Sequence, residues 1–250
     1  MKSMINWVFS AVTIVVSMMG VGSAQTSAPI PSASEVVTKM MEFDDQRRSQ
    51  MMGYTAVRNY SAVNKQRHAE MLVHVACGSD GGKQFDVLSE EGSGSIRRHV
   101  LHKLLSEETE ASRRGTRSST RITPANYDFQ VIGQQTLETG PAYILDVSPK
   151  IKNKYLVRGK IWVDANDYSI VRIEGEPARN PSFWVRSVHF VHTYQKVGPF
   201  WFASSTHTTS EIRIFGESEL TIENSNYSLN PPNKSNTPSV ELDHEARLTQ

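Results

Sequence analysis

Cysteine is almost absent from this sequence, because Cys77 is the only one in 250 residues. A single cysteine excludes an intramolecular disulfide, although an oxidising compartment would permit one. No paired histidine and aspartate pattern accompanies Cys77, so the sequence gives little support for a nucleophilic thiol. We therefore expect Cys77 to be a buried structural residue.

An excess of charge of one sign is also absent. The chain has 27 Lys and Arg against 26 Asp and Glu, a formal net charge of +1. Removal of residues 1–24 would take away Lys2 and no acidic residue, which leaves a net charge of zero. This balance argues against a nucleic-acid partner and against general acidic disorder.

The motifs of common catalytic sites are missing. The sequence has no G-x-S-x-G nucleophile elbow, and Gly92-x-Gly94 lacks the rest of a phosphate-binding loop. We predict a protein that is not an enzyme and has no cofactor. A secreted hydrolase with an unrecognised site stays open as an alternative, and activity lost on changing Ser205 or His207 would support it.

Metal-ligand spacing is missing as well. His189 and His192 lie three apart in a predicted strand and would point to opposite faces. His99 and His102 could be neighbours on a helix, yet no acidic or cysteine partner stands at ligand spacing. We therefore predict no metal site.

Long apolar runs are absent after the N-terminus. Lys2 precedes an apolar stretch from Val8 to Val21, and Gly22-Ser23-Ala24 supplies small residues for a signal peptidase. The competing interpretation is an uncleaved anchor, but the stretch is shorter than the roughly 20 residues of a membrane span. We predict export to the periplasm, cleavage after Ala24, and no membrane-spanning segment in the mature chain.

A hairpin from Tyr155 to Glu174 is the clearest structural signal. Side chains alternate across a strand, so Val157, Ile161 and Val163 are expected on one face, with Val171 and Ile173 on the same face of the return strand. Charged residues fill the other face, where opposite charges can meet across the pair. Residues 164–167 supply the turn.

Two helices are predicted before the long run of strands. Ser32 and Glu35 form a capping box for a first helix that runs to about Met52 and is rich in methionine. Ser95 could cap a second helix beginning at Ile96. The apolar stripe of this second helix is formed by Ile96, Val100, Leu101, Leu104 and Leu105.

The remaining chain is predicted to be mostly strand. Strands are expected over Tyr54–Val63 and Ala69–Ala76, and almost all of the chain from Tyr127 onward has strand patterns. We expect a leader over residues 25–31, one domain over 32–229, and a flexible tail over 230–250 that is rich in Pro, Asn and Ser.

This order, with three local motifs, resembles the outer-membrane lipoprotein carrier superfamily of LolA, LolB and RseB-like proteins. The matching residues are Ala142–Val147, Lys160-Ile161-Trp162-Val163-Asp164 followed by Ile170–Ile173, and Lys196–Phe202, where the proline precedes the aromatic residues instead of following them. The resemblance covers about residues 32–229 in outline.

The resemblance implies an α+β fold, an unclosed antiparallel β-barrel whose strongly curved sheet holds amphipathic helices in its concave face as a lid. It also implies an apolar cavity for lipid or lipoprotein acyl chains in a periplasmic carrier. We place the lid in the second helix, although such a stripe is more often ordinary core than a ligand contact. The expected cavity and lid residues are Leu101, Leu104, Leu105, Arg58, Val163, Val171 and Phe190.

Two further expectations follow from the resemblance. The same fold can serve as a regulatory module that binds an inner- or outer-membrane protein, and this alternative stays open. The regulatory members carry an additional C-terminal domain, whereas this chain ends in a predicted tail. We therefore favour a carrier, and we expect it to be a monomer.

Overall fold

The computed structural model describes residues 30–65, 67–113, 118–183, 185–213 and 216–229. The predicted signal peptide, most of the leader and the predicted tail lie outside these residues. No helix within the described ranges is both long enough and apolar enough to cross a membrane.

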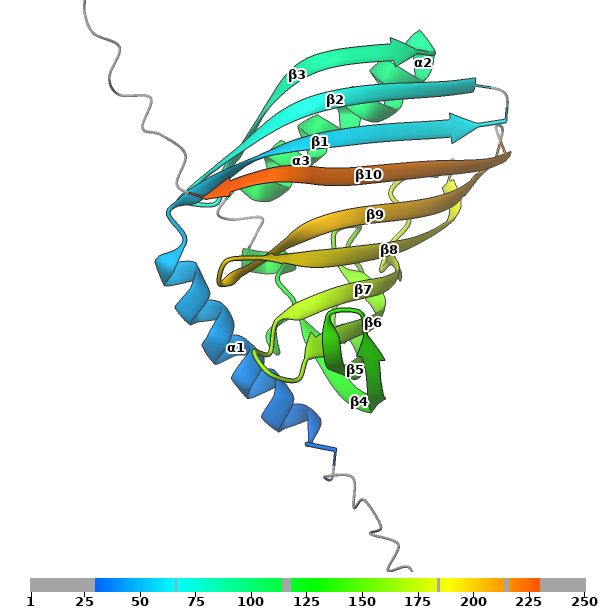
Figure 1. Cartoon of the computed structure of the whole chain (residues 1–250). Coiled ribbons are helices and arrows are strands. Elements are labelled where there is room, and N and C mark those ends of the chain that lie inside the picture. Colours follow the sequence, from blue (N-terminus) through cyan, green and yellow to red (C-terminus); the bar gives the residue numbers. More distant parts are fainter. Residues whose placement is uncertain (1–29, 66, 114–117, 184, 214–215, 230–250) are drawn as a thin grey trace, which may run out of the picture.

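Ten antiparallel strands form one continuous, curved sheet that does not close (Figure 1). Their order across the sheet is β3-β2-β1-β10-β9-β8-β7-β6-β5-β4, so β3 and β4 are the two free edges. The strands are β1 (Gly53–Asn64), β2 (Arg67–Gly78), β3 (Lys83–Gly92), β4 (Tyr127–Leu137), β5 (Gly140–Pro149), β6 (Val157–Asp164), β7 (Ile170–Pro177), β8 (Val185–Val197), β9 (Phe200–Ile212) and β10 (Gly216–Leu229). The antiparallel, unclosed sheet that the sequence predicted is thus present.

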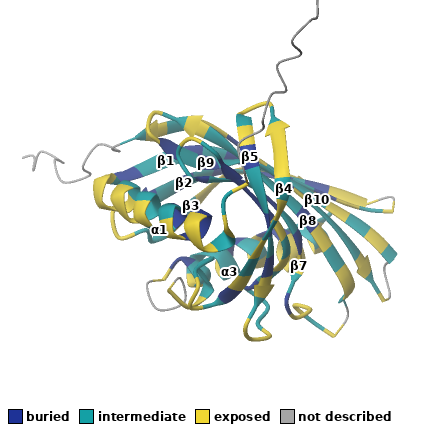
Figure 2. Ribbon diagram, turned by 90° about the horizontal axis from the view of Figure 1, so that it is seen from below, coloured by how far each residue is buried: buried dark blue, intermediate teal, exposed yellow. Residues whose placement is uncertain are grey.

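Alternating burial shows why these segments are strands. In β2, Met71, Val73 and Val75 are buried while the residues between them are partly exposed, as the sequence pattern predicted. Cys77 is buried near the end of the same strand. The edge strands differ, since most of β3 and β4 is exposed (Figure 2).

The first helix, α1 (Ala33–Gln50), begins where the sequence predicted. The Ser32 hydroxyl accepts a hydrogen bond from the Glu35 backbone N–H at 3.2 Å, which satisfies one free donor of the first turn. Its buried residues, Val36, Val37 and Met40, all lie in the first half of the helix. They pack into a core with the inner face of β4 to β8, which includes Val163 and Phe190.

The second helical segment begins slightly earlier than predicted. It comprises α2 (Gly94–Ile96), the π-helical turn η1 (Arg97–Leu101) and α3 (His102–Ser112). Ser93, and not Ser95, stands at the N-cap, and its side chain makes no capping hydrogen bond. Leu101 and Leu105 are buried in a second core against Tyr60 and Met71. The first core lies toward the β4 edge of the sheet, and the second lies toward the β3 edge.

The central hairpin departs from simple alternation at one point. Trp162 pairs with Arg172, but Val163 pairs with Ile170, so Val171 is an additional residue in β7. The bulge turns Val171 away from Ile173, and it packs beside Trp162 in a small separate cluster. The prediction that Val171 and Ile173 share a face was therefore wrong. A bulge adds one residue and so reverses which side chains of the strand face inward beyond that point. A prediction that assumes uninterrupted alternation therefore misses it.

Candidate ligand-binding site

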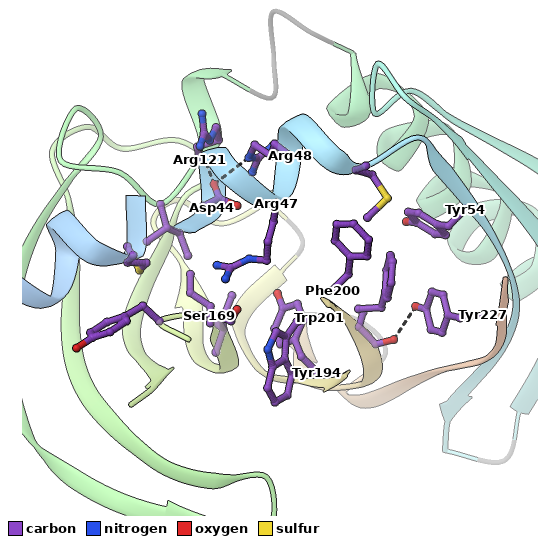
Figure 3. A pocket seen from close by; sticks show the side chains of 18 of the residues that line it. Asp44, Arg47, Arg48, Tyr54, Arg121, Ser169, Tyr194, Phe200, Trp201 and Tyr227 are labelled. Atoms are coloured by element: carbon purple, nitrogen blue, oxygen red, sulfur yellow. Dashed lines mark hydrogen bonds and ion pairs between the residues drawn. The ribbon is translucent and has the colours of Figure 1, made fainter. Parts of the chain in front are cut away.

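A pocket of about 540 Å³ lies between the second half of α1 and the inner surface of the sheet (Figure 3). The strands contribute side chains from the centre of the sheet, and the turn between β6 and β7 closes one side. The lining residues discussed below are Met40, Met41, Asp44, Arg47, Arg48, Met51, Tyr54, Arg58, Lys83, Arg121, Tyr168, Ser169, Phe200, Phe202 and Tyr227.

Helix α1 is attached over this pocket by polar contacts. The Lys39 ammonium donates to the Tyr168 hydroxyl at 3.2 Å, and the Arg47 guanidinium donates to the Asp167 backbone oxygen at 2.9 Å. The Arg121 guanidinium bridges to the Asp44 carboxylate at 2.7 Å. The first half of α1 is thus packed into the core. Its second half covers the pocket and contributes no buried residue.

Aromatic rings form the wall of the pocket near the start of β1. The Phe202 ring stacks on Tyr227 with centroids 4.7 Å apart, and it meets Tyr54 edge-on at 4.8 Å. The Tyr227 hydroxyl donates to the Ala203 backbone oxygen at 2.7 Å, and burial raises its pKa. These rings are therefore uncharged at neutral pH and present an apolar surface with fixed orientation.

A partly buried ion cluster lies beside the aromatic wall and joins α3 to the sheet. Glu108 of α3 accepts from Arg58 of β1 at 2.6 Å and from Lys83 of β3 at 2.7 Å. The Arg58 guanidinium also donates to Asn224 at 2.6 Å and to the Tyr60 hydroxyl at 3.0 Å. Burial alone would raise the pKa of Glu108, but the charges of Lys83 and Arg58 outweigh it and hold the pKa at about 2.

The histidine on the inner face of β8 has its own local partner. His192 Nδ1 lies 2.6 Å from the Thr206 hydroxyl oxygen, and burial lowers the pKa of the imidazole to about 4. His192 is therefore neutral at physiological pH. Across the described ranges, no three His, Cys, Asp or Glu side chains are arranged to hold a metal ion.

The structure separates most of the predicted site residues. Only Arg58 lines the pocket, where it is buried with Glu108 and Asn224. Val163 and Phe190 lie in the core beneath α1, and Val171 lies in the cluster around Trp162. Leu101, Leu104 and Leu105 pack with β1 and β2, so they do not line this pocket. Their contact with a ligand stays a prediction.

The sequence patterns did not indicate Arg47, Arg121, Phe202 or Tyr227 as neighbours. Two signals were present. The methionine-rich first helix indicated an adaptable surface, and Met40, Met41 and Met51 line the pocket. The aromatic group Phe200-Trp201-Phe202 follows a tight turn and belongs to one of the motifs of the family resemblance. All three residues line the pocket.

No protein-family model matches the chain, and no curated protein matches it in sequence. Among solved structures it is similar to a DUF1329 family protein from Desulfovibrio piger, with 14% identity, a TM-score of 0.43, and coverage of 79% of this chain and 93% of that chain. A domain assigned to outer membrane lipoprotein sorting from Vibrio parahaemolyticus has 11% identity, a TM-score of 0.40, and coverage of 80% and 95%.

A LolA superfamily protein from Nitrosomonas europaea has 9% identity, a TM-score of 0.35, and coverage of 81% of this chain and 95% of that chain. At these scores the likeness assigns neither a ligand nor a partner. The LolA superfamily named for this last structure is also among those that the sequence motifs resemble.

Proposed function

We propose that this protein is an exported, non-catalytic carrier that binds an acyl chain of a lipid or lipoprotein in the pocket beneath α1. The observation that carries the proposal is the pocket itself, about 540 Å³ in volume, whose lining includes the rings of Tyr54, Phe202 and Tyr227 and the side chain of Met51, just after the end of α1. A pocket of this size that combines apolar walls with polar groups at fixed positions is typical of small-molecule sites.

The energetics favour a long apolar ligand. Each buried methylene group contributes about 0.8 kcal/mol, so a chain of about a dozen carbons could gain roughly 10 kcal/mol before ordering costs are subtracted. Methionine side chains are flexible and adapt to different chain shapes. Such binding needs no catalytic residue.

The second half of α1 is the part of the cover that can move in this proposal. Its contacts with the rest of the molecule include ion pairs of partly exposed side chains, such as Arg121 with Asp44, the hydrogen bond of Arg47 to a backbone oxygen, and the stacking of Phe43 on Tyr168 at 5.8 Å. Such ion pairs contribute about 1 kcal/mol or less each. The helix could therefore lift at moderate cost while Val36, Val37 and Met40 stay in the core.

The substitution Met51→Trp is expected to weaken binding of an apolar probe by about ten-fold or more, because the larger ring occupies ligand space. Binding is measured by the fluorescence rise of an uncharged naphthylamine dye. Met52→Trp is the matched control, since Met52 is the next residue, is 67% exposed, and does not line the pocket. Equal dye affinity in both variants would count against this pocket as the site.

The purified protein is also expected to carry lipid that organic solvent extracts and mass spectrometry detects. An empty extract together with no uptake of the dye would contradict the proposed function. A carrier should pass its cargo to an acceptor membrane, whereas a regulatory module should form a lasting complex with a membrane protein, and a pull-down separates these two roles.

A further inference from the structure

One cation in the pocket is without a carboxylate partner. Arg48 and Arg121 both pair with Asp44, and Arg58 and Lys83 both pair with Glu108. Arg47 instead donates to a backbone oxygen and lies near the Phe43 ring, and no acidic side chain of the described chain forms an ion pair with it. Figure 3 shows Arg47 reaching from α1 toward the turn that carries Ser169.

The charges around the pocket favour an anion. Its lining includes five cationic side chains and one carboxylate, that of Asp44. Glu108 and Asp45 contact these cations from outside the lining, and the cations still outnumber the acids when both are included. Asp167 stands near Arg47, but its carboxylate is paired with Lys196 at 2.8 Å. The site therefore keeps a local positive excess in a chain that is otherwise nearly neutral.

A buried hydroxyl without a well-formed hydrogen bond lies on the same side of the pocket. Ser169 is 4% exposed, and its Oγ makes no hydrogen bond of good geometry within the described residues, although the hydroxyl lies close enough to the Asp167 carboxylate to help lower its pKa. Buried polar side-chain atoms nearly always have a partner, so a hydroxyl this weakly engaged at a pocket wall can donate to a bound acceptor. The Ser169 backbone N–H donates to the Asp167 carboxylate, and the Asp167 backbone oxygen accepts from Arg47, so both residues adjoin Asp167.

We infer that the pocket selects amphiphiles with an anionic head, a carboxylate or a phosphate, whose oxygens pair with Arg47 and accept from the Ser169 hydroxyl. This inference rests on the proposed function, because the acyl chain would extend from the head toward Phe202, Tyr227 and Met51. A guanidinium forms strong charge-assisted hydrogen bonds with both head types.

The test is displacement of the uncharged dye by twelve-carbon ligands that differ only in the head, all below their micelle thresholds. Dodecanoate and dodecyl phosphate are expected to displace the dye at concentrations about ten-fold lower than dodecanol, and dodecyltrimethylammonium is expected to be weakest. Arg47→Gln should remove the preference for anions, so that dodecanoate and dodecyl phosphate displace the dye no better than dodecanol does. Arg186→Gln, at an exposed arginine of β8, is the matched control and should keep the preference.

The outcomes separate the two proposals. Equal displacement by all four ligands would overturn the inference about the head and leave the apolar carrier intact, whereas no displacement by any ligand would contradict the carrier itself. An anion preference that survives Arg47→Gln would overturn the assignment to Arg47. Competition by inorganic phosphate as strong as that by dodecyl phosphate would show a site for free anions and overturn the amphiphile inference.

Discussion

The substitution Glu108→Gln is expected to lower the free energy of unfolding by about 3 kcal/mol at neutral pH. Glu108 is the shared anion of Arg58 and Lys83, and the Arg58 side chain is only 7% exposed. Removing one partner of a buried ion pair costs roughly 3–5 kcal/mol, because the other charge stays buried without compensation. We expect the lower end, since Glu108 itself is 29% exposed and Asn224 still contacts Arg58.

Urea unfolding followed by circular dichroism measures this change. Glu110→Gln is the matched control on the same helix, because Glu110 pairs only with the exposed Arg113. That control is expected to change stability by about 0.5 kcal/mol or less. If Glu108→Gln were as stable as Glu110→Gln, the cluster would not fasten α3 to the sheet.

The same carboxylate predicts a dependence on pH. The folded pKa of Glu108 is about 2, below the ordinary value of 4.5, so its stabilisation is complete above pH 4.5 and is lost as the pH falls toward 2. The wild-type protein should therefore lose stability over this range more steeply than the glutamine variant. The difference in the free energy of unfolding between the wild type and Glu108→Gln should become smaller as the solution is acidified.

The substitution Gly175→Ala is expected to destabilise the protein by about 3 kcal/mol or enough to prevent folding. Gly175 of β7 pairs directly with Gly159 of β6. A methyl group on Gly175 would overlap the Arg158 backbone oxygen and lie 3.1 Å from Gly159 Cα. Backbone atoms in the middle of a sheet cannot move aside as a side chain can, so the strands would have to separate.

The matched control for this variant is Gly133→Ala in β4, where an added Cβ would meet nothing within 4 Å. It is expected to be neutral or slightly stabilising, because alanine reduces the conformational freedom of the unfolded chain. Thermal unfolding of both variants gives the comparison. Similar midpoints for both would show that the close approach of β6 and β7 is not required.

Local patterns predicted much of the secondary structure. The first helix begins at its predicted cap, β1 and β2 cover the two segments predicted as strands, and Cys77 is buried. These features depend on neighbours within a few residues along the chain, and sequence periodicity reports such relations directly. The same patterns missed the bulge at Val171, because one additional residue leaves composition and hydrophobicity unchanged.

The candidate site was less visible, since its residues are far apart in sequence. Arg58 and Glu108 are 50 residues apart, yet their charged atoms meet at 2.6 Å. Nothing local in either segment indicates the other. The sequence also favoured the second helix as a cover, but the structure places the pocket beneath the first. Both helices carry apolar stripes, and a stripe shows that a face is covered without showing what covers it.

Sequence patterns were enough to identify most of the elements: which segments are strands or helices, where the first helix begins, and which faces are apolar. The tertiary structure was needed to show that the second half of α1 lies over an aromatic wall, and that Arg47, which forms no ion pair within the described chain, lines the same pocket as Ser169. The physical reason is that side-chain alternation is set within each strand. The neighbours of a pocket depend instead on the curvature and register accumulated across ten strands.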